Sequence, residues 1–217
     1  MIDKYLISNS LIVIQEFNDR FSHLSNEQLK EFSDKEFSES DLVFLVAFPF
    51  KHLARFSTLG SGRDIYIKPL DFCIEAKYLR NTKSTNGHYS NTITWKNAFQ
   101  KDFEWLCEEI KRGNKGKRAF ILGWFNVVDS FSQIMQLGKG GSNGKSGGGL
   151  PDVNDEKLRL FPFLNLDGDK IKTKDIKYMY SKAYDNHSIT VKGLFTNTVN
   201  CIFLGKESDK FHFAIYF

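Results

Sequence analysis

The chain has 217 residues, of which 41% are hydrophobic and 26% charged, a balance that predicts a folded globular protein and excludes an intrinsically disordered one. Its formal net charge of +4 is compatible with a polyanionic partner such as nucleic acid but does not require one. The most apolar run, residues 42–50, is too short for a membrane-spanning helix, which needs about 20 residues. Because no signal peptide is recognisable, we expect a soluble cytoplasmic protein without a membrane partner.

The spacing of cysteine and histidine argues against a zinc site. Cys73, Cys107 and Cys201 form no CxxC pair, and the five histidines show no HxH or HxxxH spacing. Zinc sites usually contain such close pairs. Each cysteine has apolar neighbours, so we expect buried, reduced thiols, as is usual in the cytoplasm.

The N-terminal part is predicted to be helical. Apolar residues recur at helical spacing over 3–32, and Ser25 with Gln28 makes the pattern of a capping box that starts a second helix.

A third helix is expected next, capped by Ser40 or Asp41 and running to Phe56, with an interruption at Pro49, which cannot donate a helical hydrogen bond. The glycine-containing segment 57–63 then predicts a turn.

A hairpin, a helix and a strand are predicted in the middle of the chain. Two short strands, 64–67 and 72–78, flank a turn that contains Pro69, which predicts a hairpin. Aromatic and aliphatic residues at steps of three and four over 92–112 predict an amphipathic helix that ends before Gly113. The largely apolar segment 117–125 is expected to be a strand.

The C-terminal third begins after a glycine-rich segment, 138–150, which we expect to be a flexible loop because it offers little surface to bury. Residues 151–217 are expected to be β-rich and to pack on a core made by residues 1–137. They contain a predicted helix at 173–183 and predicted strands at 188–195, 200–204 and 210–217. The predicted fold class is α/β, with a mixed central sheet flanked by helices and a small β-rich C-terminal part.

The candidate chemistry lies in the predicted hairpin. Asp64 begins its first strand, and Glu75 and Lys77 lie near the end of its second strand. Residues two apart on a strand point to the same face, so Glu75 and Lys77 project together, and strand pairing can bring Asp64 close to them. Two carboxylates are typical Mg²⁺ ligands, and a lysine can stabilise charge that develops on a phosphate.

This pattern resembles the PD-(D/E)xK nuclease superfamily, which has a restriction-endonuclease-like core of helix, three strands, helix and strand. The order of predicted elements over residues 40–126 is similar to that core. The resemblance implies that Asp64 and Glu75 are metal ligands and that Lys77 assists the attacking water. Arg63 replaces the proline that names the motif, and this proline is often missing in the family.

Other residues are weaker candidates. Asp71 is an alternative to Asp64, although its place in the turn suits a turn-forming aspartate. An extra acid often joins such sites, and Glu39 is favoured over Glu36 and Glu16. Phosphate contacts are expected from three residues on the helix after the motif, namely Lys96, Gln100 and Lys101.

We therefore predict an endonuclease that uses Mg²⁺ or Mn²⁺ to hydrolyse phosphodiester bonds. DNA as the partner and a role in defence are implied by the resemblance alone. Two alternatives stay open: an inactive nuclease-like subunit of a larger complex, and an unrelated interaction protein. A homodimer is common among nucleases that cut both strands, but the sequence does not indicate one.

Overall fold

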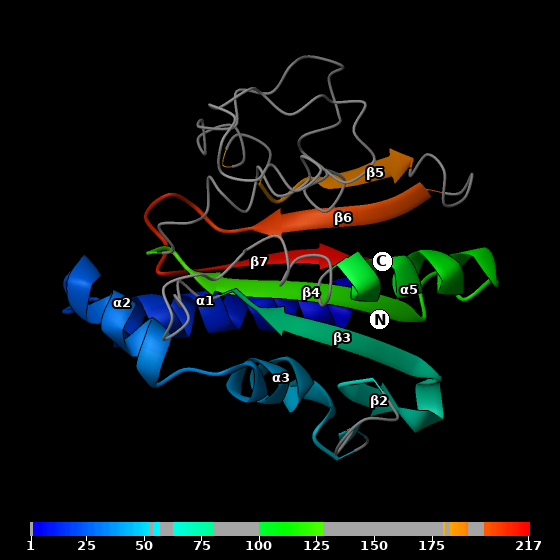
Figure 1. Ribbon diagram of the computed structural model, residues 1–217, viewed down its shortest axis with the longest axis horizontal. Coiled ribbons are helices and arrows are strands. Elements are labelled where there is room, and N and C mark those ends of the chain that lie inside the picture. The colour runs from blue at the N-terminus through cyan, green and yellow to red at the C-terminus, as the bar shows by residue number, and fades with distance from the viewer. Residues whose placement is uncertain are drawn as a thin grey trace, which may run out of the picture.

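The computed structural model shows helices on a curved β-sheet (Figure 1). The structure describes the following residues: 2–52, 54–56, 63–79, 100–127, 180, 183–190 and 198–217. No helix within these ranges is long and apolar enough to cross a membrane.

The N-terminal helices are η1 (Ile2–Ile7), α1 (Ser8–Arg20), α2 (Asn26–Lys35) and α3 (Glu39–Ala47), and they are followed by the 3₁₀ turn η2 (Phe48–Phe50). The predicted capping box of α2 is confirmed. The Ser25 backbone N–H donates to Gln28 Oε1 at 3.0 Å, and the Gln28 N–H donates to Ser25 Oγ at 3.3 Å.

The start and the end of the third helix differ from the prediction. Ser38, rather than Ser40 or Asp41, is the N-cap of α3, and Asp41 is its partner three residues later: the Asp41 N–H donates to Ser38 Oγ at 3.3 Å. The reciprocal exchange between Ser38 and Asp41 satisfies two N–H groups at once, which a cap at Ser40 would not do. The helix does not continue to Phe56, because Pro49 lies in η2 and Ala54–Phe56 form the strand β1.

The strands of the described residues form one seven-stranded sheet in the order β1-β2-β3-β4-β7-β6-β5, with β3 and β4 as its parallel pair and antiparallel neighbours elsewhere. A mixed sheet with helices is therefore confirmed. The strands after β1 are β2 (Ile65–Ile67), β3 (Phe72–Tyr78), β4 (Arg118–Phe125), β5 (Asn186–Thr190), β6 (Thr198–Leu204) and β7 (Phe211–Tyr216).

The predicted hairpin and middle elements are confirmed where the structure describes them. β2 and β3 pair antiparallel around the 3₁₀ turn η3 (Lys68–Leu70). The helix α5 (Gln100–Lys111) links β3 to the parallel β4, and the first part of the predicted helix, 92–99, lies outside the described residues. α5 is followed by Gly113, whose φ of +91° favours glycine.

The C-terminal strands extend the same sheet, because β7 pairs with β4 and β6 pairs with β7. The predicted strands 200–204 and 210–217 are confirmed, and β6 begins earlier, at Thr198. The glycine-rich segment 138–150 and most of the predicted helix 173–183 lie outside the described residues.

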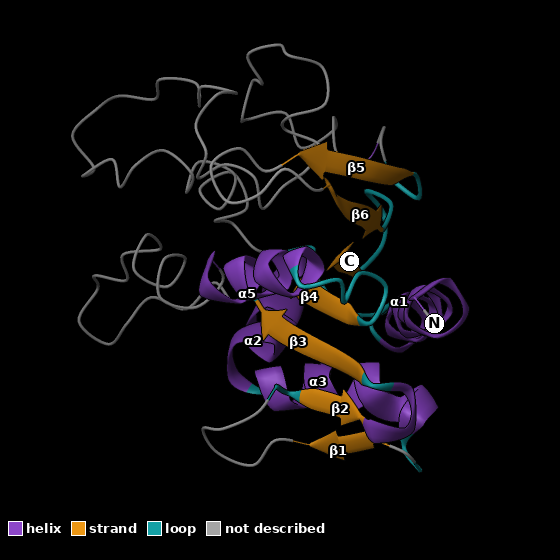
Figure 2. Ribbon diagram, turned by 90° about the vertical axis from the view of Figure 1, so that its right-hand side faces the viewer, coloured by secondary structure: helices purple, strands orange, loops and turns teal. Residues whose placement is uncertain are grey.

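Helices cover both faces of the sheet, and Figure 2 shows α1 and α5 on opposite sides of β4. On one face, Phe17 of α1 stacks on Phe125 of β4, with ring centroids 5.5 Å apart. On the other face, Phe103 of α5 contacts the Tyr216 ring edge-on at 5.6 Å. Because side chains alternate along a strand, β3 places Ala76 in the core of the first face and points its neighbours toward α5.

The cysteines agree in part with the expectation of buried thiols. Cys107 and Cys201 are buried and free, whereas Cys73 is half-buried.

Candidate functional site

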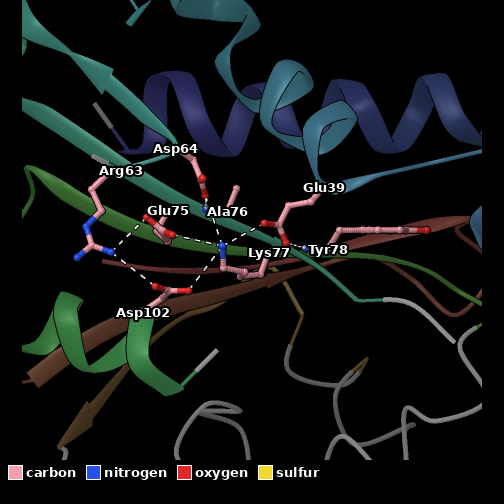
Figure 3. Close-up of polar contacts among 8 residues, drawn as sticks. All are labelled: Glu39, Arg63, Asp64, Glu75, Ala76, Lys77, Tyr78 and Asp102. Atoms are coloured by element: carbon pink, nitrogen blue, oxygen red, sulfur yellow. Dashed lines mark hydrogen bonds and ion pairs between the residues drawn. The ribbon is translucent and has the colours of Figure 1, made fainter. Parts of the chain in front are cut away.

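Glu75 and Lys77 meet on the α5 side of β3, as their spacing predicts. The Lys77 ammonium Nζ lies 3.3 Å from Glu75 Oε1. It also lies between 3.1 and 3.7 Å from oxygens of three further carboxylates (Figure 3), which belong to Glu39, Asp64 and Asp102. Four acids that are distant in sequence therefore surround one nitrogen atom.

Asp64 lies directly before the first residue of β2, Ile65. The pairing of β2 with β3 stops at Ile65 opposite Ile74, so the next N–H group on that edge of β3 has no strand partner there. Asp64 Oδ2 accepts this hydrogen bond from the Ala76 N–H at 2.8 Å. The Asp64 carboxylate thus takes the place of the backbone carbonyl that would accept this hydrogen bond in a paired strand. The same hydrogen bond holds the carboxylate in place.

Glu39 occupies the next position along the same edge. Its Oε2 accepts a hydrogen bond from the Tyr78 N–H at 3.4 Å, and its Oε1 lies 3.1 Å from Lys77 Nζ. Glu39 is the first residue of α3, directly after the Ser38 cap, so the capping box fixes where this side chain begins. Of the three N-terminal acids considered above, Glu39 is the one whose described contacts include Lys77.

Two further described side chains, Arg63 and Asp102, belong to the cluster, and the motif did not reveal their roles. Arg63 Nη1 lies 3.3 Å from Glu75 Oε2 and 3.5 Å from Asp102 Oδ1, and the Arg63 guanidinium lies 4.1 Å from the centre of the Trp105 ring. The sequence spacing could have indicated that Asp102 is buried, because Asp102, Leu106 and Glu109 are spaced by four and three residues and so share one face of a helix. All three are buried in the structure.

The charges of the cluster shift the pKa values of its members. Burial raises the pKa of Glu75, and the negative charges of Asp64 and Asp102 raise it further. Lys77 and Arg63 lower this pKa, but the net shift is upward. Burial likewise raises the pKa of Asp102 despite the two nearby cations. Burial alone would lower the pKa of Lys77, but the surrounding carboxylates hold it well above its usual range, so Lys77 is a protonated hydrogen-bond donor at neutral pH.

The donor chemistry of this cluster suits a hard divalent cation. Among the residues that the structure describes, the four carboxylates contact two cations, Lys77 and Arg63, so the described part of the cluster has more acidic than basic groups. Mg²⁺ commonly takes one or two carboxylates and completes its shell with water and phosphate oxygens, and Asp64 and Glu75 are two carboxylates that lie 3.7 and 3.3 Å from the same Lys77 nitrogen. Among the described residues, no group of three or more His, Cys, Asp or Glu is arranged to hold a metal ion.

A second ion cluster anchors the opposite end of α5. Arg118 Nε donates to Glu109 Oε2 at 2.8 Å, and Arg118 Nη1 donates to the Asp71 carbonyl at 2.6 Å. The Asp71 carboxylate lies 3.6 Å from Arg118, and its backbone has the positive φ of a turn. Asp71 therefore belongs to this anchoring cluster rather than to the one around Lys77.

The three predicted phosphate-binding residues lie partly beyond what the structure describes. Lys101 is exposed on α5. Lys96 and the side chain of Gln100 lie outside the described residues, so their role stays a prediction.

Comparison of the chain with protein-family models, with curated proteins and with solved structures finds no match.

Proposed function

We propose that this protein is a metal-dependent nuclease that hydrolyses phosphodiester bonds of DNA. The observation that carries the proposal is the convergence of Asp64, Glu75 and Lys77, with contacts to Lys77 Nζ at 3.7 and 3.3 Å. The element order α3, β1, β2, β3, α5, β4 supports it, because it agrees with the helix, three strands, helix and strand of the PD-(D/E)xK family.

Each side chain has a role that follows from its surroundings. Asp64 and Glu75 would hold Mg²⁺ or Mn²⁺, and a bound ion polarises the phosphate and lowers the pKa of an attacking water. Lys77 keeps its proton, so it orients the water and stabilises negative charge on the phosphate rather than acting as a base. Glu39 and Asp102 position the lysine, and the Ala76 N–H positions Asp64.

Plasmid cleavage tests this proposal. Wild-type protein is incubated with supercoiled DNA in Mg²⁺, in Mn²⁺ and in EDTA, beside the variants Asp64→Asn and Asp71→Asn. Asparagine at position 64 can still accept the Ala76 hydrogen bond but has lost the negative charge that a metal requires. We expect cleavage only with metal, a loss of at least about a hundredfold in Asp64→Asn, and little change in Asp71→Asn. Cleavage that survives EDTA, or equal loss in both variants, would contradict the proposed roles.

A second candidate function is that of a non-catalytic binding subunit. The observation in its favour is that Lys77 is already held by four carboxylates, as in a closed ion-pair network that serves only stability. This alternative predicts that folded wild-type protein cuts neither DNA nor RNA with either metal.

A further inference from the structure

Arg118 and Arg63 both contact acids of α5, and they are held very differently. Arg118 makes short hydrogen bonds of 2.8 and 2.6 Å to Glu109 and to the Asp71 carbonyl, and its side chain is 10% exposed. Arg63 lies 3.3 and 3.5 Å from Glu75 and Asp102, and its side chain is 33% exposed. Charge-assisted hydrogen bonds usually measure about 2.7–2.9 Å, so Arg118 is locked in place and Arg63 is held loosely.

The guanidinium of Arg63 is nevertheless oriented. It lies 4.1 Å from the centre of the Trp105 ring, a cation–π contact that fixes the plane of the group without using its N–H donors. Both contacts to the acids go through Nη1. A planar fork of donors is therefore presented at the edge of the acid cluster, directly before Asp64 in the chain.

We propose that Arg63 is a substrate-binding residue that neutralises Glu75 and Asp102 until a divalent cation binds, and that it then binds a phosphate of the nucleic acid. This inference rests on the proposed function. A cation at Glu75 supplies the positive charge that Arg63 otherwise provides, and the loose contacts of Arg63 are easily given up. Guanidinium binds phosphate oxygens in the same two-pronged way as it binds carboxylates.

This arrangement links the metal to the DNA. The metal competes with Arg63 for the acids, and the released Arg63 adds to DNA affinity. Removing Arg63 should therefore strengthen metal binding and weaken DNA binding. Removing an arginine with a purely structural role would weaken both kinds of binding or neither.

The test measures each affinity separately in the full chain. Mn²⁺ binding is measured without DNA by calorimetry, and binding of a fluorescent DNA duplex is measured by anisotropy in Ca²⁺ and in EDTA, with a gel to show that the duplex stays uncut. The variants are Arg63→Ala, Arg63→Gln, which keeps a shorter and uncharged polar side chain, and Arg112→Ala, which removes an exposed positive charge that pairs with Glu108 and Glu109 at the far end of α5.

We expect both Arg63 variants to bind Mn²⁺ about threefold more tightly, because one weak ion-pair competitor is gone. In Ca²⁺ they should bind DNA about tenfold more weakly, and the slope of log K against log salt should fall by about one, which corresponds to one lost phosphate contact. In EDTA the slope should not change, since Arg63 is then held by the acids. Arg112→Ala should not show this metal-dependent loss.

Weaker Mn²⁺ binding in both Arg63 variants would overturn the inference, because it would make Arg63 a residue that organises the acids. Arg63 variants whose DNA affinity and salt slope in Ca²⁺ equal those of wild type would also overturn the inference. In either case, metal-dependent cleavage by the wild-type protein would leave the proposed function intact. A wild-type protein that binds neither Mn²⁺ nor DNA would defeat the proposed function itself and this inference with it.

Discussion

Replacing Lys77 by methionine, which keeps most of the length of the side chain and removes its charge, should destabilise the protein at neutral pH. The lysine side chain is 12% exposed and those of Glu75 and Asp102 are 9% and 13% exposed. Removing one partner from a buried ion cluster costs about 3–5 kcal/mol. We expect the low end, about 3 kcal/mol, because Asp64 and Glu39 are 26% and 45% exposed and water screens their repulsion.

The loss should depend on pH in a defined direction. The pKa values of Glu75 and Asp102 are already raised in the folded protein, and Lys77 is a cation that lowers both. Without Lys77 they rise further above their unfolded values of about 4. A carboxyl group with a raised folded pKa destabilises the fold at pH values above that pKa, and protonation relieves this cost as pH falls toward the unfolded pKa. The variant should therefore lose less stability, relative to wild type, at pH 5 than at pH 7.5.

Urea unfolding of wild type and Lys77→Met at pH 7.5 and pH 5 measures this difference. At pH 7.5 the melting temperature should also fall by roughly 6–12 °C for a chain of this size. Lys35→Met is the matched control, because Lys35 pairs with Glu31 at the surface, where the two side chains are 70% and 61% exposed, and its unfolding midpoint should not move. A Lys77→Met protein as stable as wild type at pH 7.5, or destabilised equally at both pH values, would refute the reasoning.

Three further substitutions test the framework that carries the site. Ser38→Ala removes the cap of α3, from which Glu39 begins, and should cost about 1 kcal/mol in urea unfolding; an unchanged midpoint would mean that the capping box does not stabilise α3. Gly205→Ala should cost more than about 2 kcal/mol, because φ is +145° and an added Cβ would overlap the buried His212 ring; a neutral effect would show that the ring can move away. Phe17→Ala removes a ring that contacts four others and should cost about 3–5 kcal/mol, so a loss below about 1 kcal/mol would contradict the packing described here.

Local pattern was sufficient for several elements of the fold. The Ser25 capping box and the stripe of α5 depend on residues three or four apart, which are neighbours on any helix. The hairpin of β2 and β3 depends on a short turn between two apolar runs. For the same reason the sequence could place Glu75 and Lys77 on one face of a strand before the structure was known.

The prediction failed where two local signals competed. Ser38, Ser40 and Asp41 all lie near the start of α3. Ser38 is the cap because an acid, Asp41, follows it by three residues and completes the capping box. The segment after Pro49 was predicted to be helical, yet Ala54–Phe56 pair with β2 as a strand. Pairing with residues 9 to 13 positions later in the chain overrides a weak helical pattern.

The candidate trio of Asp64, Glu75 and Lys77 follows from local pattern, because a hairpin brings its two strands together whatever surrounds it. The other charges of the cluster join this trio through tertiary packing. Asp102 arrives because the crossover through α5 lays that helix over the parallel pair β3 and β4, and Arg63 becomes part of the cluster because Trp105 and two buried carboxylates hold its guanidinium. Contacts between residues so far apart in sequence depend on how elements pack, and no short motif specifies packing.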